Sequence, residues 1–130
     1  MDIIELMRSS EGPSVQKFSI YLPDKDKNQA PVRDLDAWIS AAVRILTDIN
    51  GGSTKLPTAE GSWKDKNGTT LIDNTVVVYS FIRNPDDFEG RFKEIVAFVH
   101  EFGRGANQES VMLEVTDGHR AYFIDENDYI

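Results

Sequence analysis

The sequence predicts an α+β fold, a ferredoxin-like β-α-β-β-α-β sandwich with an antiparallel sheet, two helices on one face and a short extra C-terminal strand. Three observations predict it. Residues 17–22 alternate apolar and polar side chains, as a half-buried strand does. Residues 35–49 and 88–102 carry apolar side chains at helical intervals of three and four. Between them, Asn67-Gly68 lies between two extended segments, which is a strong hairpin signal.

The chain is predicted to begin with an arm, residues 1–14, followed by a single domain over residues 15–130. The first strand ends at Pro23, because proline cannot donate to a strand ladder. The polar residues 24–28 have the spacing that opens a calcium loop. Calcium is excluded there because Leu35 stands where that loop needs a glutamate.

The first helix is predicted over residues 35–49. Asp34 is the expected N-cap, and Gly51-Gly52 supplies the left-handed end. Residues 53–64 then form an irregular extended segment, in which Pro57 and Gly61 indicate an edge strand or a bulge.

The return strand over residues 70–82 is rich in β-branched side chains, which favours a central position in the sheet. Asn84-Pro85 begins the second helix, and Gly103 is expected to end it. Residues 110–116 form the next strand. The turn Asp117-Gly118 leads to the short last strand, residues 121–124.

Both faces of the long strand are apolar. The two sets are Val77, Tyr79 and Phe81 on one face and Val76, Val78 and Ile82 on the other. Each predicted helix has a single apolar stripe, so one sheet face is left uncovered. We therefore expect a homodimer that stacks sheet on sheet. The alternative is that the N-terminal arm covers this face.

Composition excludes several classes of protein. The 130 residues include 14 Lys and Arg against 22 Asp and Glu, a formal net charge of −8. This balance argues against nucleic acid and anionic membranes as ligands, and it is compatible with a basic protein partner. There is no cysteine, and there are two histidines, His100 and His119. We therefore predict a cytoplasmic domain with no cofactor, no metal site and no catalytic residues.

The densest polar cluster is the predicted loop of residues 103–109. Two glycines free its backbone, and Arg104, Asn107 and Gln108 together present groups that bind an anion or a carboxylate. The alternative is a polar connector that satisfies backbone groups, with Arg104 compensating the helix dipole.

A second candidate is the stretch Glu60-Gly61-Ser62-Trp63. Trp63 and Tyr79 would form the wall of a pocket at the open sheet face, with Glu60 orienting a ligand. The alternative places Trp63 in the core or at the dimer interface. Neither histidine has a sequence neighbour that suggests a catalytic pair.

Several of these segments resemble a family of small uncharacterised bacterial proteins. The resemblance runs from Gly103-Arg104 through Asn107-Gln108 to Asp117-Gly118 and Tyr122, and it includes Asn50-Gly51-Gly52 and the stretch 60–63. It covers about two-thirds of the chain with loosely specific motifs. It implies a bacterial origin and a single domain, and no activity.

The function predicted from these features is a non-catalytic acidic binding module that docks on or regulates a partner protein, as antitoxins and immunity proteins do. One alternative is a dimeric α+β barrel that senses or converts a small molecule in a pocket between sheet and helices, lined by Trp63, Tyr79 and Arg104. A second alternative is a structural subunit that only oligomerises. The fold class does not choose among the three.

Overall fold

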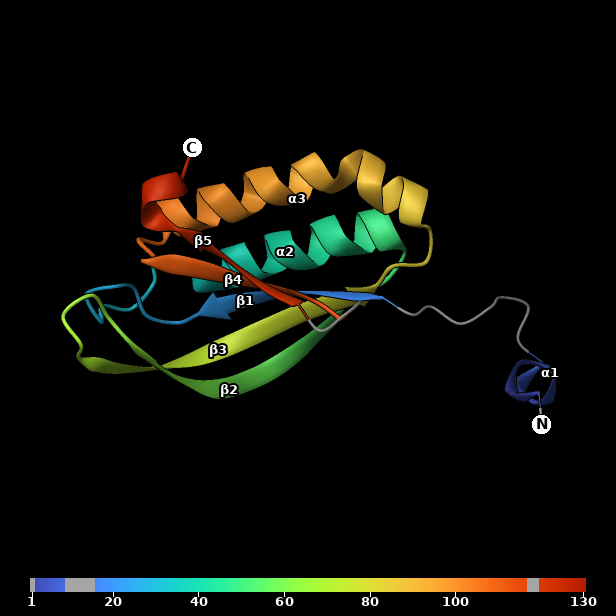
Figure 1. Ribbon diagram of the computed structural model, residues 1–130, viewed down its shortest axis with the longest axis horizontal. Helices are drawn as coiled ribbons and strands as arrows, with labels where there is room; N and C mark the ends of the chain where they lie inside the picture. Colours follow the sequence, from blue (N-terminus) through green and yellow to red (C-terminus); the bar gives the residue numbers. More distant parts are fainter. Residues whose placement is uncertain (1, 9–15, 117–119) are drawn as a thin grey trace.

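The computed structural model describes residues 2–8, 16–116 and 120–130. Figure 1 shows two long helices lying side by side on one face of a sheet. In chain order the elements are α1 (Ile3–Met7), β1 (Lys17–Pro23), α2 (Leu35–Asn50), β2 (Thr54–Lys64), β3 (Thr70–Phe81), α3 (Pro85–Gly105), β4 (Ser110–Val115), β5 (Arg120–Asp125) and the short 3₁₀ helix η1 (Glu126–Asp128).

The sheet is antiparallel throughout, and its strand order is β2-β3-β1-β4-β5. The long β3 is an interior strand, paired with β2 on one side and β1 on the other, as its β-branched composition predicts, and β1 is the middle strand. The α+β class and the antiparallel sheet are therefore confirmed. The narrower ferredoxin-like assignment is not confirmed and stays a prediction.

The core lies between the helices and one face of the sheet. Phe18, Ile20 and Leu22 point from β1 toward the helices and are at most 1% exposed. Leu46 of α2 and Phe102 of α3 meet them from the other side and are fully buried. The alternation in β1 and the stripes of the two helices thus supply the two surfaces of a single core.

The ends of α2 follow the prediction in one respect and depart from it in another. Gly51 takes the left-handed conformation, with φ 83°, and its N–H donates to the carbonyl of Thr47, as expected of a C-cap. Asp34 precedes the first helical residue, but its φ is 57° and its side chain makes no capping bond. The expected side-chain cap is therefore wrong.

At the start of α3 the predicted cap is confirmed. Asn84 Oδ1 accepts from the backbone N–H groups of Asp86 and Asp87, both at 3.1 Å. The predicted end at Gly103 is wrong, because α3 continues to Gly105. A Cβ atom on Gly103 would lie 2.3 Å from Cζ of Tyr129, so this glycine makes room for a packed ring and does not end the helix.

The β2–β3 hairpin is confirmed with its turn. Gly68 has φ 80°, and Asp65 Oδ1 accepts from the N–H groups of Asn67 and Thr69. The register of β2 against β3 shifts between Leu56 and Ala59, as the irregular segment predicts. The predicted turn at residues 117–118, and His119, lie outside the described residues.

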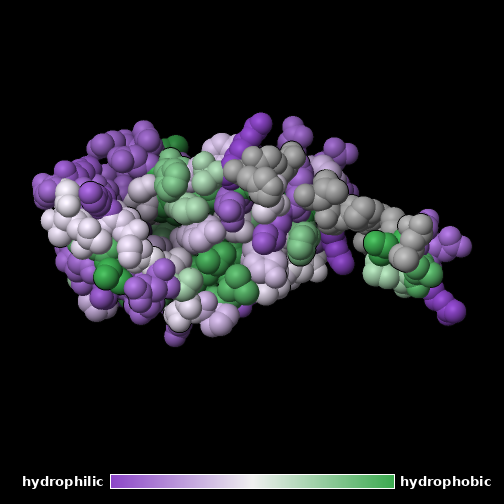
Figure 2. All heavy atoms as spheres, turned by 60° about the horizontal axis from the view of Figure 1, so that its bottom comes forward, coloured by the Kyte–Doolittle hydropathy of each residue, from purple (hydrophilic) through white to green (hydrophobic). Residues whose placement is uncertain are grey.

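No helix covers the second face of the sheet in Figure 1. Apolar side chains gather on this side of the molecule between polar ones (Figure 2), and Phe81 is 49% exposed. The homodimer through this face stays a prediction. Among the helices of the described ranges, none is long and apolar enough to cross a membrane. The cytoplasmic location stays a prediction as well.

Candidate functional site

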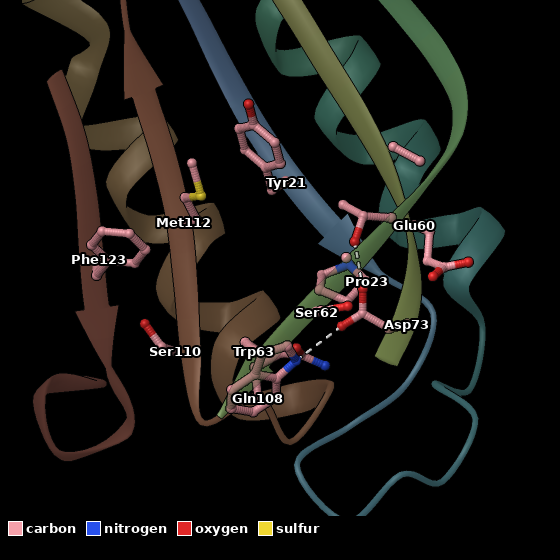
Figure 3. A pocket seen from close by; sticks show the side chains of 13 residues that line it. Tyr21, Pro23, Glu60, Ser62, Trp63, Asp73, Gln108, Ser110, Met112 and Phe123 are labelled. Atoms are coloured by element: carbon pink, nitrogen blue, oxygen red, sulfur yellow. Dashed lines mark hydrogen bonds between the residues drawn. The ribbon is translucent and has the colours of Figure 1, made fainter. Parts of the chain in front are cut away.

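The open sheet face holds a pocket of about 350 Å³. Its floor is β1, and its two sides are the outer half of the β2–β3 hairpin and the pair β4–β5 (Figure 3). The side chains that form most of its surface are aromatic or otherwise apolar: Tyr21, Pro23, Trp63, Met112 and Phe123. A pocket of this size and character is typical of sites for small organic ligands.

The strand register places these side chains on one face. Tyr21 pairs with Val77 of β3, and Phe18, Ile20 and Leu22 have the opposite orientation because side chains alternate along a strand. Met112 of β4 pairs with Phe123 of β5. Phe123 is 67% exposed, so it offers an aromatic surface to a ligand at the pocket's edge.

A buried carboxylate, that of Asp73, lies on the hairpin side of the pocket. The residue is 6% exposed. Its Oδ2 accepts from the indole Nε1 of Trp63 at 3.2 Å, and its Oδ1 accepts from the hydroxyl of Thr75 at 2.7 Å (Figure 3). Both oxygens therefore have a donor, which fixes the orientation of the carboxylate.

Gly61 pairs with Asp73 across the hairpin and provides the space for its carboxylate. A Cβ atom on Gly61 would lie 3.0 Å from Asp73 Oδ1 and 3.6 Å from Thr75 Oγ1. Any side chain at this position would push against the hydrogen-bonded group. The glycine that sequence reasoning assigned to a bulge is thus a neighbour of the pocket's carboxylate.

Tyr21 contributes a hydroxyl as well as a ring. The hydroxyl donates to Glu114 Oε1 at 3.1 Å. Burial raises the pKa of Tyr21, and the hydrogen bond to Glu114 and its charge raise it further. The phenol therefore stays protonated near neutral pH, with its proton directed at Glu114.

The negative side chain that faces the pocket, among the described residues that line it, is that of Asp73, and none of these residues is a lysine, arginine or histidine. Among the described residues, no group of three acidic or histidine side chains is placed to hold a metal ion. The arrangement suits a ligand that is apolar and carries positive charge.

Three of the residues proposed from sequence line this pocket. Trp63 does so with its ring. Glu60 pairs with Asn74, so its side chain lies on the opposite face from Gly61, and Figure 3 shows it on the outer side of the hairpin. Gln108 is 4% exposed, and its Nε2 donates to the carbonyls of Lys25 and Ala106, so its amide supports the neighbouring loop.

The other proposed residues lie elsewhere. Arg104 is in the last turn of α3, where its guanidinium donates to the carbonyl of Ile130. Asn107 donates to Asp26 Oδ2 at 3.3 Å, and the Tyr79 ring lies under the ammonium of Lys17. The expected loop over residues 103–109 is therefore helical in its first part. Binding roles for these three residues stay predictions.

Sequence reasoning missed most of the pocket. Tyr21, Thr75, Ser110, Met112 and Phe123 resemble ordinary strand residues in the sequence. Asp73 carried a signal, because it interrupts an otherwise apolar strand, and a buried carboxylate needs partners. The small-molecule alternative placed its pocket between sheet and helices. The pocket described above lies instead on the face away from the helices (Figure 3), so the position between sheet and helices stays a prediction.

No family model matches the sequence, and no curated protein matches it. A search of solved structures finds a phage SAM lyase in complex with S-methyl-5′-thioadenosine, with a TM-score of 0.66 and 18% identity, covering 94% of this chain and 98% of that chain. It also finds a phage SAM lyase in the apo state, with a TM-score of 0.60 and 18% identity, covering 88% of this chain and 92% of that one. At this identity the likeness shows a shared fold.

These findings contradict the prediction of a non-catalytic module that acts through protein–protein contacts. The similar structures are those of an enzyme, and one of them holds a small nucleoside. They favour the alternative of a small-molecule enzyme or sensor. The acidic composition, interpreted above as suited to a basic protein, is equally suited to a cationic small molecule. The resemblance to small uncharacterised bacterial proteins stays a prediction.

Proposed function

We propose that this chain is an enzyme that binds a sulfonium nucleoside of the S-adenosylmethionine (SAM) type in the open-face pocket and cleaves it to S-methyl-5′-thioadenosine. The observation that carries the proposal is the carboxylate of Asp73. It is buried and held by two hydrogen bonds in a pocket that is otherwise mostly apolar and has no cation among its described lining residues. The fold shared with a phage SAM lyase supports the same conclusion.

The walls of the pocket suit the nucleoside part of such a ligand. A purine ring stacks well on flat aromatic or thioether surfaces, and Phe123, Met112 and Trp63 offer three of these. The volume of about 350 Å³ is within the range of pockets for molecules of this size.

Asp73 provides a negative charge for the sulfonium group of such a ligand. A sulfonium carries a permanent positive charge that cannot donate a hydrogen bond, so it is recognised by negative charge and by aromatic faces. Thr75 and Trp63 hold the carboxylate, and Tyr21 supplies an aromatic face on the floor. Each oxygen of Asp73 accepts a hydrogen bond from the protein. We therefore assign the carboxylate the role of attracting the ligand's positive charge and not that of a general base.

The cleavage has a defined electron balance. Release of the methylthioadenosine breaks the bond between sulfur and the first methylene carbon of the aminobutyrate group, and the electron pair of that bond goes to sulfur. At the same time an oxygen of the ligand's own carboxylate forms a bond to that carbon and closes a five-membered lactone, which is the second product. The sulfonium thereby becomes a neutral thioether. Because charge is lost as the bond breaks, the apolar walls favour the reacting state over the bound sulfonium, and Asp73 chiefly contributes affinity for the substrate.

Binding measurements with Asp73→Asn test the proposal. We expect both SAM and the neutral thioether product to bind the wild-type pocket. The amide keeps the shape but removes the charge, so it should weaken SAM binding tenfold or more, on the order of the 1.5–3 kcal/mol of a charge-assisted contact, and change product binding little. Glu89→Asn, on the exposed face of α3, is the control. Absence of binding by both ligands to the folded wild-type protein would refute the proposal.

A further inference from the structure

The charges of the pocket match only part of the SAM molecule. SAM has a sulfonium and an ammonium group, which are positive, and a carboxylate, which is negative. Asp73 provides negative charge for the positive groups. Among the residues that the structure describes, those that line the pocket provide no cation for the ligand carboxylate, because none of them is lysine, arginine or histidine.

Two lysines of the loops that follow β1 and join β2 to β3 are already paired with an acid. Lys27, in the loop after β1, lies 3.0 Å from Glu126 Oε2, and Lys66, in the β2–β3 turn, contacts Glu126 Oε1. Hydrogen bonds from Lys66 and Lys27 lower the pKa of Glu126, so this acid stays ionised and holds both ammonium groups. Neither of these lysines lines the pocket, and neither does Lys25, whose carbonyl accepts from Gln108 Nε2.

We infer that the pocket selects its ligand by positive charge and gives the ligand carboxylate no ionic partner, so that decarboxylated SAM binds more tightly than SAM itself. This inference rests on the proposed function and deepens it. It assigns the site to sulfonium nucleosides with a cationic side chain, whose carboxylate is not required for binding.

Electrostatics gives the direction and a minimum size of the effect. Decarboxylation raises the net charge of the ligand from +1 to +2 and removes a group that Asp73 repels. One such charge pair separated by about 6 Å in a water-like medium already changes affinity about threefold, and the effect grows as the local dielectric falls. We therefore expect decarboxylated SAM to bind at least about threefold more tightly at low salt, with the ratio shrinking at 1 M salt.

The experiment compares three ligands on the wild-type protein: S-methyl-5′-thioadenosine, SAM and decarboxylated SAM. Dissociation constants come from stopped-flow titrations of tryptophan fluorescence, before turnover alters the ligands, since Trp63 lines the pocket. The neutral thioether reports on the nucleoside pocket alone. The ratio of the other two constants reports on the carboxylate.

A gain-of-function variant provides an independent arm. Ser110 lines the pocket from the start of β4 and is partly exposed, so it accepts a longer side chain. Ser110→Lys adds the missing cation, and Ser110→Met adds a chain of similar length without charge. We expect the lysine variant to bring the two affinities together or to invert their order, and the methionine variant to keep the wild-type ratio.

The outcomes separate the two claims. If none of the three ligands binds, the proposed function fails and the inference fails with it. If the thioether and SAM bind but SAM binds as tightly as its decarboxylated form or more tightly, the proposed function stands and the inference is overturned. An unchanged ratio in Ser110→Lys also overturns it, because added positive charge would then not be felt by the carboxylate.

Discussion

The indole N–H of Trp63 donates to the carboxylate of Asp73 at 3.2 Å, from one strand of the β2–β3 hairpin to the other. This bond joins the largest aromatic side chain of the pocket to its buried charge. Because Asp73 is 6% exposed, its oxygens depend on protein donors, and the geometry of the site depends on this pair.

Replacing Trp63 with phenylalanine should test this dependence. The variant keeps an aromatic wall but leaves Asp73 Oδ2 without its donor. We expect a loss of about 1–3 kcal/mol in the free energy of unfolding, measured by urea titration, and weaker SAM binding. Trp38→Phe is the control, because Trp38 packs against Phe102 and does not line the pocket. Equal losses of SAM affinity in both variants would contradict the account.

The substitution Gly61→Ala probes the space beside the carboxylate. Its Cβ atom would lie 3.0 Å from Asp73 Oδ1, so the carboxylate must move by a few tenths of an ångström. We expect a several-fold rise in KM for SAM with little change in melting temperature. In Gly52→Ala the new methyl group meets no atom within 4 Å, so this variant should have the wild-type KM.

Gly103 and Gly90 form a matched pair within α3. Alanine at the exposed Gly90 meets nothing and should stabilise the helix by about 0.5–1 kcal/mol. Alanine at Gly103 would overlap the Tyr129 ring, so we expect it to destabilise the fold and displace the ring. Burial raises the pKa of Tyr129 to about 12, and spectrophotometric titration should show this value falling toward 10 in Gly103→Ala. Stabilisation by both substitutions would contradict the packing described.

The two ion pairs of Glu126 predict that the stability of the fold depends on pH. Hydrogen bonds from Lys66 and Lys27 lower the pKa of Glu126 below 4.5, and the bond to Glu126 raises the pKa of Lys66 above 10.5. The ion pairs therefore stabilise the fold between pH 4.5 and pH 10.5. This stabilisation is lost as the pH falls through the lowered pKa of Glu126. Urea midpoints of wild type and Glu126→Gln should differ at pH 7, and the difference should shrink as the pH falls below 4.5. A difference that stays constant on acidification would indicate another cause.

The sequence predicts much of the fold because its local signals agree with one another. The stripes of α2 and α3, the Asn84 cap and the turn at Gly68 are local patterns with a single structural solution. The prediction at Gly103 was wrong because glycine is needed there to make room for the ring of Tyr129, 26 positions further along the chain. A local pattern cannot reveal such a partner.

The pocket was less predictable for the same reason. Tyr21, Asp73 and Met112 come from three strands, and only the strand order and register bring them together. Of the proposed residues, Trp63 lies where a pocket wall was expected, at the open sheet face. Arg104 and Asn107 drew notice as a polar cluster, but their donors have partners in Ile130 and Asp26. Polar density alone therefore did not locate the pocket.

The most direct test of the central claim is a product assay. Purified protein is incubated with SAM, and S-methyl-5′-thioadenosine is followed by chromatography and mass spectrometry, with wild type beside Asp73→Asn. The account predicts that wild type releases the thioether at a rate proportional to enzyme concentration, and that the variant needs a higher SAM concentration to reach half its maximal rate. Release no faster than in the absence of protein, from wild type that is folded and saturated with SAM, would contradict it.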